Sequence, residues 1–147
     1  MRCLNCSGPI GAKSSKYCSN RCQFDHQYKE YIRRWKAGLE SGRTGRTSLQ
    51  LSRYIKRYLV EKYGEECCKC GWNKRHPVTG RVPLEANHIN GNAEDNRESN
   101  LELLCPNCHS LTANFRFLNK GMGRAYRRKA VRDGSAAANI SIGSVEF

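Results

Sequence analysis

Nine cysteines in a chain of 147 residues are the first sign of chemistry in this sequence. Four of them form two Cys-x-x-Cys pairs at the ends of a long polar stretch: Cys67, Cys70, Cys105 and Cys108. Two such pairs supply the four thiolates that a structural zinc ion binds in a tetrahedron. Pro106 suits the first turn of a helix, so the second pair is expected at a helix start. The spacing predicts a zinc site that joins the two ends of the stretch.

A second group of four cysteines lies near the start of the chain. Cys3 and Cys6 form a further Cys-x-x-Cys pair, and Cys18 and Cys22 are spaced to share one face at the start of a helix. These four residues predict another structural zinc site. His26 could replace one of the ligands, but a solvent-facing position on the helix is the favoured interpretation.

The number of cysteines also bears on which one is left unpaired and on the cellular compartment of the protein. Cys68 is the cysteine left over, because Cys68-x-Cys70 is too tight for a usual zinc knuckle. An odd number of cysteines fits poorly with complete disulfide pairing. The chain shows neither a signal-peptide pattern nor a stretch apolar enough to span a membrane. We therefore expect a protein of the reducing cytoplasm that is neither secreted nor bound to a membrane.

The charge of the chain indicates the kind of partner. The formal net charge is +13, and the excess of Lys and Arg is concentrated in residues 1–47 and 119–147, with near balance in residues 48–118. Basic flanks on both sides of a nearly neutral centre are typical of proteins that bind nucleic acid. Large aliphatic residues are few, so metal binding is expected to supply part of the folding energy.

Two helices and a hairpin are expected to position these residues. Tyr28, Tyr31, Ile32 and Trp35 recur at helical spacing and predict a packed aromatic stripe after the first cysteine group. A second helix is expected to begin at an N-cap Ser48 and to run to Tyr63, where Gly64 ends it. Residues 81–89 and 101–105 are predicted as strands, 90–100 as a polar loop and 105–118 as a helix.

These elements divide the chain into four predicted parts. They are an N-terminal zinc-binding module with its helix (1–37), a linker (38–47), a central domain (48–118) and a basic, disordered tail (119–147).

Basic side chains on the second helix and in the tail are candidates for contacts with phosphate groups. They are Arg53, Lys56, Arg57, Arg124, Arg127, Arg128 and Lys129. The alternative for the helix residues is an ordinary solvated face, and the two interpretations are about equally supported.

Residues 84–115 read LEANHINGNAEDNRESNLELLCPNCHSLTANF and contain His88, Asn100 and His109 in that order. Here the chain resembles the HNH endonucleases, in the branch whose motif is framed by cysteines. The flanking segments KYCSNRCQFDHQYKEYIRRWKAG and GMGRAYRRK are similar to those of bacteriophage-type members. The resemblance implies a small α+β protein held together by zinc. Its ββα-metal nuclease core would follow an N-terminal zinc-finger module, treble-clef-like, and helices.

The resemblance also implies roles for individual residues. His88 would act as the general base, because an imidazole accepts a proton near neutral pH. Asn87 and His109 would bind one catalytic Mg²⁺ or Mn²⁺ ion. Asn100 would bridge the loop and orient His88. Glu85 could assist indirectly, although a plain surface position on the strand is the favoured alternative.

The sequence therefore predicts a metal-dependent HNH endonuclease that hydrolyses double-stranded DNA, acts as a monomer rather than a dimer, and works in the cytoplasm of a bacterial host. Plasmid nicking would separate this function from the alternative, a non-catalytic zinc-finger protein that binds DNA. Binding of RNA is less favoured, because a sheet of stacking aromatic residues is not seen.

Overall fold

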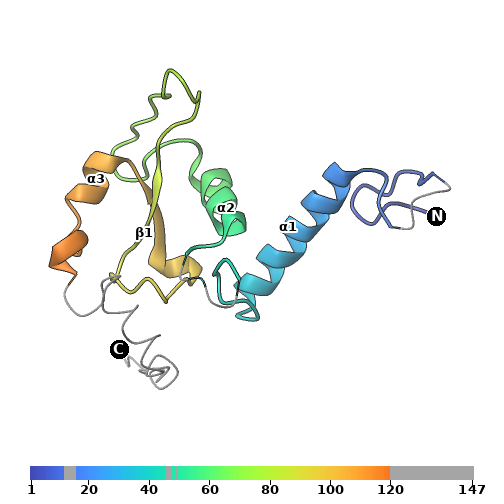
Figure 1. Cartoon of the computed structure of the whole chain (residues 1–147), viewed down its shortest axis with the longest axis horizontal. Coiled ribbons are helices and arrows are strands. Elements are labelled where there is room, and N and C mark those ends of the chain that lie inside the picture. Colours follow the sequence, from blue (N-terminus) through green and yellow to red (C-terminus); the bar gives the residue numbers. More distant parts are fainter. Residues whose placement is uncertain (12–15, 46–47, 49, 120–147) are drawn as a thin grey trace.

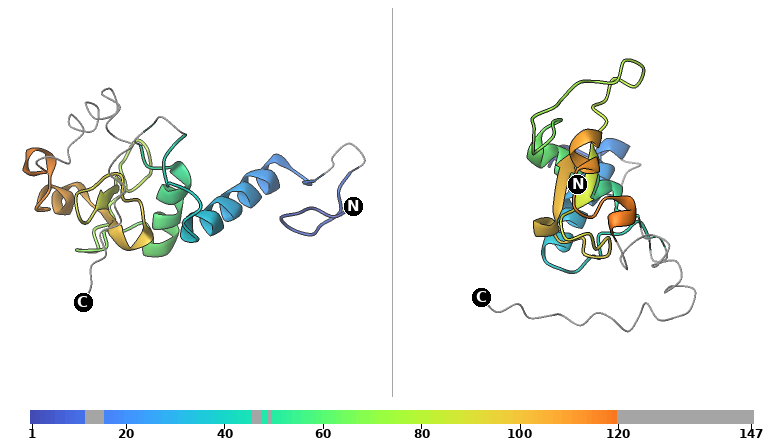
Figure 2. Two further views of the ribbon diagram at one scale, coloured as in Figure 1. Left: turned by 90° about the horizontal axis from the view of Figure 1, so that it is seen from below. Right: turned by 90° about the vertical axis from the view of Figure 1, so that its left-hand side faces the viewer.

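The computed structural model describes residues 1–11, 16–45, 48 and 50–119. Its longest helix, α1 (Asn20–Lys36), carries the N-terminal segment at one end and packs against the rest of the protein at the other (Figures 1 and 2). The helix begins at Ser19, whose hydroxyl accepts a hydrogen bond from the N–H of Cys22 and so satisfies one open donor of the first turn. The N-terminal segment therefore lies far from the strands, at the outer end of α1.

The aromatic stripe predicted for α1 is confirmed. Tyr28, Ile32 and Trp35 are buried, and Tyr31 is partly buried against them. They pack on Ile55 and Leu59 in one cluster that also includes Leu101 and Leu103. The C-terminal half of α1 thus shares a core with the second helix and the second strand.

Helix α2 (Arg53–Tyr63) starts later than the sequence predicts. Its N-cap is Ser52, whose hydroxyl accepts from the N–H of Tyr54, and the expectation of Ser48 is wrong. The reason is that the backbone before Ser52 is already paired with an earlier segment. Arg43 and Leu51 form an antiparallel β-bridge, and the N–H of Thr44 donates to the carbonyl of Gln50 at 2.8 Å. Gly64 ends the helix as predicted, with a φ of 77° that favours glycine.

Two short antiparallel strands form the sheet. β1 (Glu85–His88) pairs with β2 (Leu101–Leu104), and His88 lies opposite Leu101. The first strand is shorter than the predicted 81–89, because the N–H of Leu84 turns back to the carbonyl of Val82. The loop from Ile89 to Arg97 and a single 3-10 turn, Glu98–Asn100, connect the strands.

The helix after β2 also differs from the prediction. α3 spans only Pro106–Ser110, and a separate 3-10 turn follows at Arg116–Leu118, so the expected continuous helix over 105–118 is wrong. The hydroxyl of Thr112 donates to the carbonyl of His109 at 2.8 Å, where the helical pattern ends. Asn114 then donates to the backbone carbonyls of His88 and Ile89, which draws this segment back onto the hairpin.

A second, smaller core lies beside the hairpin. It contains Cys67, Leu104 and Cys105, with Trp72 and Leu84 packed against them. Together these elements confirm the predicted α+β class, with a two-stranded sheet and α3 against both strands. No helix in the described part of the chain is long and apolar enough to cross a membrane.

Candidate metal centres and active site

The four cysteines that flank the polar stretch converge. The Sγ atoms of Cys67, Cys70, Cys105 and Cys108 all lie within 4.8 Å of one another. The Sγ atoms of Cys70 and Cys105 are 3.8 Å apart, close to the edge of about 3.8 Å that a tetrahedron with Zn–S bonds of about 2.3 Å requires. The group could therefore hold a zinc ion, and the predicted grouping of these cysteines is confirmed.

Backbone geometry holds part of this cysteine cluster in place. Cys105 is the N-cap of α3, and its Sγ accepts from the N–H of Cys108 at 3.4 Å. Cys68 is not part of the cluster: its thiol lies on the exposed side, 3.8 Å from Oε2 of Glu102. The assignment of Cys68 as the leftover cysteine therefore agrees with the structure.

The N-terminal cysteines converge in the same way. The Sγ atoms of Cys3, Cys6, Cys18 and Cys22 lie within 4.8 Å of one another, and those of Cys18 and Cys22 are 3.4 Å apart. His26 is not in this cluster; its Nδ1 lies 3.2 Å from the hydroxyl of Tyr17. The group could hold a second zinc ion, as the spacing predicts.

Each cysteine cluster contains at least one thiol whose pKa is lowered. The backbone N–H of Cys6 lowers the pKa of Cys3 to about 6. Burial acts to raise the pKa of Cys67, but backbone N–H groups of Cys105 and Cys70 outweigh it, and the pKa falls to about 6. Since zinc binds thiolate, each cluster has a ligand in the binding form at neutral pH.

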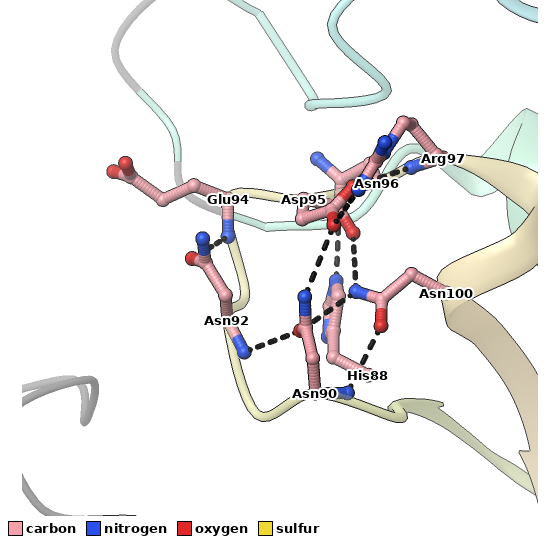
Figure 3. Close-up of polar contacts among 8 residues, drawn as sticks. All are labelled: His88, Asn90, Asn92, Glu94, Asp95, Asn96, Arg97 and Asn100. Carbon is pink, nitrogen blue, oxygen red and sulfur yellow. Dashed lines mark hydrogen bonds and ion pairs between the residues drawn. The ribbon is translucent and has the colours of Figure 1, made fainter. Parts of the chain in front are cut away.

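The polar loop between β1 and β2 is organised by Asn100 (Figure 3). Its Oδ1 accepts from the N–H of Asn90 at 2.9 Å, and its Nδ2 donates to Oδ1 of Asn90 and to the carbonyl of Asp95 at 2.9 and 2.8 Å. Asn100 is buried, so these contacts satisfy an amide that water does not reach. The side chain bridges the two ends of the loop, the contact expected from the sequence.

His88 lies at the end of β1, and its ring contacts a residue that the sequence did not single out. Its Nε2 is 2.8 Å from Oδ1 of Asn96, a contact drawn in Figure 3. Asn100 fixes the backbone around His88, since the carbonyl of Asn100 accepts from the N–H of Ile89, but the ring contact belongs to Asn96. Two asparagines therefore contact His88 and its surroundings: Asn96 at the ring, and Asn100 at the backbone that follows it.

Asn87 is buried on β1, directly before His88. Its Nδ2 donates to Oε1 of Glu102, directly opposite on β2, at 2.8 Å, and Lys69 balances that carboxylate at 3.4 Å. Because the amide nitrogen is held by Glu102, the carbonyl Oδ1 is the atom through which Asn87 would bind a cation.

His109 reaches from α3 to the start of β1. Its Nδ1 contacts the carboxylate of Glu85, and its ring packs edge-on against Phe115 at 5.2 Å between centroids. A histidine that donates one ring N–H to a carboxylate presents its other nitrogen, here Nε2, to a metal, which is the usual arrangement at metal sites. His109 and Asn87 offer a ring nitrogen and an amide oxygen, two donor types that a divalent cation binds. Glu85 is exposed, but it also contacts His109, so it is more than a plain surface residue.

The basic candidates on α2 differ in their surroundings. The guanidinium of Arg57 stacks 3.9 Å over the ring of Tyr28 and pairs with Asp25 and Glu61 at 3.1 and 2.8 Å. Among the described residues no ion pair is seen for Arg53 or Lys56, and both are exposed. The tail candidates Arg124, Arg127, Arg128 and Lys129 lie outside the described residues.

The residue that sequence reasoning missed is Asn96. The polar loop contains four asparagines, at positions 90, 92, 96 and 100, and nothing in their spacing separates one from another. The feature that distinguishes Asn96 is its contact with Trp35. The N–H of a buried indole needs an acceptor, and here the acceptor is the backbone carbonyl of Asn96. The pairing spans two elements far apart in the chain.

Comparison with known proteins gives one informative match. No family model and no solved structure matches the chain. A stretch of 47 residues is 47% identical to the H-N-H endonuclease F-TflIV of Escherichia phage T5. This stretch is 32% of the chain and 20% of that protein, so the chain matches about a fifth of the relative's length. The match confirms the family resemblance: over this stretch the chain is related to the HNH endonucleases.

Proposed function

We propose that this protein is a metal-dependent HNH endonuclease of the phage type, similar to homing and nicking enzymes, that hydrolyses phosphodiester bonds in double-stranded DNA. The observation that carries the proposal is the meeting of α3 and β1, where His109, held by Glu85, is brought to the strand that carries Asn87 and His88. The similarity to a phage endonuclease supports the same conclusion.

The proposed reaction is a hydrolysis in which the chain supplies the base. His88 takes a proton from water while the water oxygen bonds to phosphorus. The bond from phosphorus to the 3′ oxygen breaks and that oxygen takes up a proton, which leaves a 5′-phosphate and a 3′-hydroxyl. A divalent cation, Mg²⁺ or Mn²⁺, would stabilise the charge that develops on the phosphate and on the leaving oxygen.

The remaining residues have binding and structural roles in this proposal. Arg53 and Lys56 are exposed without a described ion pair and would contact DNA phosphates, whereas Arg57 is already held by two carboxylates. The two cysteine clusters would each hold a structural zinc ion. We further propose the ββα-metal fold for residues 48–118, a treble-clef-like fold for the N-terminal module, a monomeric state and action in the host cytoplasm.

Plasmid nicking tests the proposal. Zinc-loaded protein with Mg²⁺ or Mn²⁺ is expected to convert supercoiled plasmid to the open circle, and His88→Ala is expected to lower the rate by about 10²–10⁴-fold with DNA affinity nearly unchanged. His76→Ala is the matched control, since His76 lies in an exposed turn where its Nδ1 accepts from Val78 and Thr79. Binding of DNA without nicking in either metal would favour the alternative, a non-catalytic zinc-finger protein.

A further inference from the structure

The contact between His88 and Asn96 determines which nitrogen of the histidine can accept a proton. Nε2 of His88 lies 2.8 Å from Oδ1 of Asn96 (Figure 3). The direction of this hydrogen bond depends on how the asparagine amide is oriented, since its oxygen accepts and its nitrogen donates.

A second contact settles the orientation of that amide. Nδ2 of Asn96 lies 2.9 Å from the backbone carbonyl of Ser41, and a carbonyl can only accept. The nitrogen of the amide must therefore face Ser41, and the oxygen must face His88. Because that oxygen can only accept, Nε2 of His88 carries the hydrogen. A neutral imidazole has one N–H, so its basic lone pair is on Nδ1.

Asn96 is itself held from outside the hairpin. It is buried, with 4% of its surface exposed, and its backbone carbonyl accepts from Nε1 of Trp35 at 2.8 Å. Gly42 packs directly against it: a Cβ built at Gly42 would lie 2.6 Å from Cβ of Asn96. The residues that hold Asn96 thus come from α1 and from the segment that follows it.

We propose that Asn96 is a positioning residue that holds His88 with Nε2 protonated and Nδ1 directed to the reacting water. This proposal rests on the proposed nuclease function for the role of His88. It adds that residues 35–42, which the sequence divides between a helix and a linker, support the general base. Asn100 and Asn96 have separate tasks in it: Asn100 shapes the loop backbone, and Asn96 holds the ring.

The hydrogen bond can be tested on the unaltered, zinc-loaded chain. Long-range ¹H–¹⁵N correlation spectra at alkaline pH, where an ordinary imidazole is neutral, report which nitrogen of each histidine is protonated. We expect His88 to be protonated at Nε2 and to show an Nε2 proton that exchanges slowly with water. A spectrum with the proton of His88 on Nδ1 would overturn the proposal, whether or not the protein cuts DNA.

Variants then test the effect on the reaction. Asn96→Ala removes the acceptor, and we expect the Nε2 proton signal to disappear and kcat for nicking to fall by about tenfold to a hundredfold with little change in KM. Asn96→Asp keeps an acceptor for Nε2–H and is expected to retain the signal and a larger kcat than Asn96→Ala. Asn92→Ala is the matched control, because the side chain of Asn92 accepts from the backbone N–H of Glu94 within the same loop.

The outcomes separate this proposal from the proposed function. Nicking that is equally fast in Asn96→Ala and in the parent would overturn the positioning role and leave the nuclease in place. A slowly exchanging Nε2 proton that Asn96→Ala abolishes, in a protein without nicking activity, would support the contact and overturn the nuclease. Where Asn96→Ala does not fold, as judged by circular dichroism, two other measurements test the proposal. They are the protonated nitrogen of His88 in the spectrum of the parent and the Nε2 proton signal of the Asn96→Asp variant.

Discussion

The indole of Trp35 donates a hydrogen bond to the backbone carbonyl of Asn96 at 2.8 Å, and this contact joins the end of α1 to the loop between the strands. Both residues are buried, so water cannot replace either partner.

The first prediction concerns this bond. Trp35→Phe keeps an aromatic ring but leaves the carbonyl of Asn96 without its donor, and we expect the free energy of unfolding to fall by about 1–3 kcal/mol. Urea unfolding of the zinc-loaded protein measures the change. Trp72→Phe makes the same substitution in the second core cluster and is the control. Equal losses in the two variants would show that the loss of ring volume, and not the hydrogen bond, is responsible.

Alanine substitutions at two glycines test whether residues 38–45 pack closely against the loop of the hairpin. Gly42 and Gly38 both have a positive φ, of 77° and 74°, at which the Cβ of alanine is strained. At Gly42 a Cβ would also meet Asn96 at 2.6 Å and Ile55 at 2.8 Å, whereas nothing lies within 4 Å at Gly38. We expect Gly42→Ala to destabilise the protein by about 1–3 kcal/mol more than Gly38→Ala in thermal or urea unfolding. Equal destabilisation would mean that the segment does not pack against Asn96 in solution.

Metal analysis tests the cysteine clusters. We expect two zinc ions per chain, and removal of zinc by a strong chelator is expected to unfold the protein, because binding of structural zinc supplies folding energy. Cys70→Ser and Cys6→Ser are each expected to lower the content to one ion, and Cys68→Ser is expected to keep both, since its thiol lies outside the cluster. A parent content of one zinc ion would exclude one of the two sites.

Glu98 makes stability depend on acid pH. The hydroxyl of Tyr58 donates to its carboxylate at 2.6 Å, and Lys62 and Lys36 lie at 3.0 and 3.6 Å; the Tyr58 hydrogen bond is the largest cause of a lowered pKa. A carboxyl whose pKa is lower in the folded state stabilises the protein above its unfolded pKa of about 4.3, and this stability is lost as the pH falls through the folded pKa.

Glu98→Gln measures that contribution. The parent is expected to be more stable than the variant near neutral pH, by about 1 kcal/mol or less because the site is partly exposed to solvent. The difference is expected to shrink as the pH is lowered from about 5 to about 3. Urea unfolding of both chains at each pH measures it. Zinc loss at acid pH affects both chains alike, so a difference that stays constant with pH would contradict the prediction.

Local patterns in the sequence were sufficient for several features. The cysteines group as their spacing predicts, because a Cys-x-x-Cys pair places its two thiols together whatever surrounds it. The stripe that includes Tyr28, Ile32 and Trp35 is buried because helical periodicity alone puts these side chains on one face. The order of His88, Asn100 and His109 pointed to the family that the phage relative confirms over part of the chain.

Tertiary contacts decided the rest. Ser52 rather than Ser48 begins α2, because the backbone around Gln50 and Leu51 is paired with Arg43 and Thr44. Local sequence favours a longer helix after Cys105, but contacts of the following segment with β1 and the loop after it end α3 at Ser110.

The same distinction explains why Asn96 could not be found from the sequence. Its partners are His88, Ser41 and Trp35, and they lie on three different elements. A local pattern records which residue types follow one another, and so it identifies ligands that are close along the chain. Which of four asparagines meets a histidine depends on how α1 and the segment after it pack against the hairpin, and only the folded chain determines that packing.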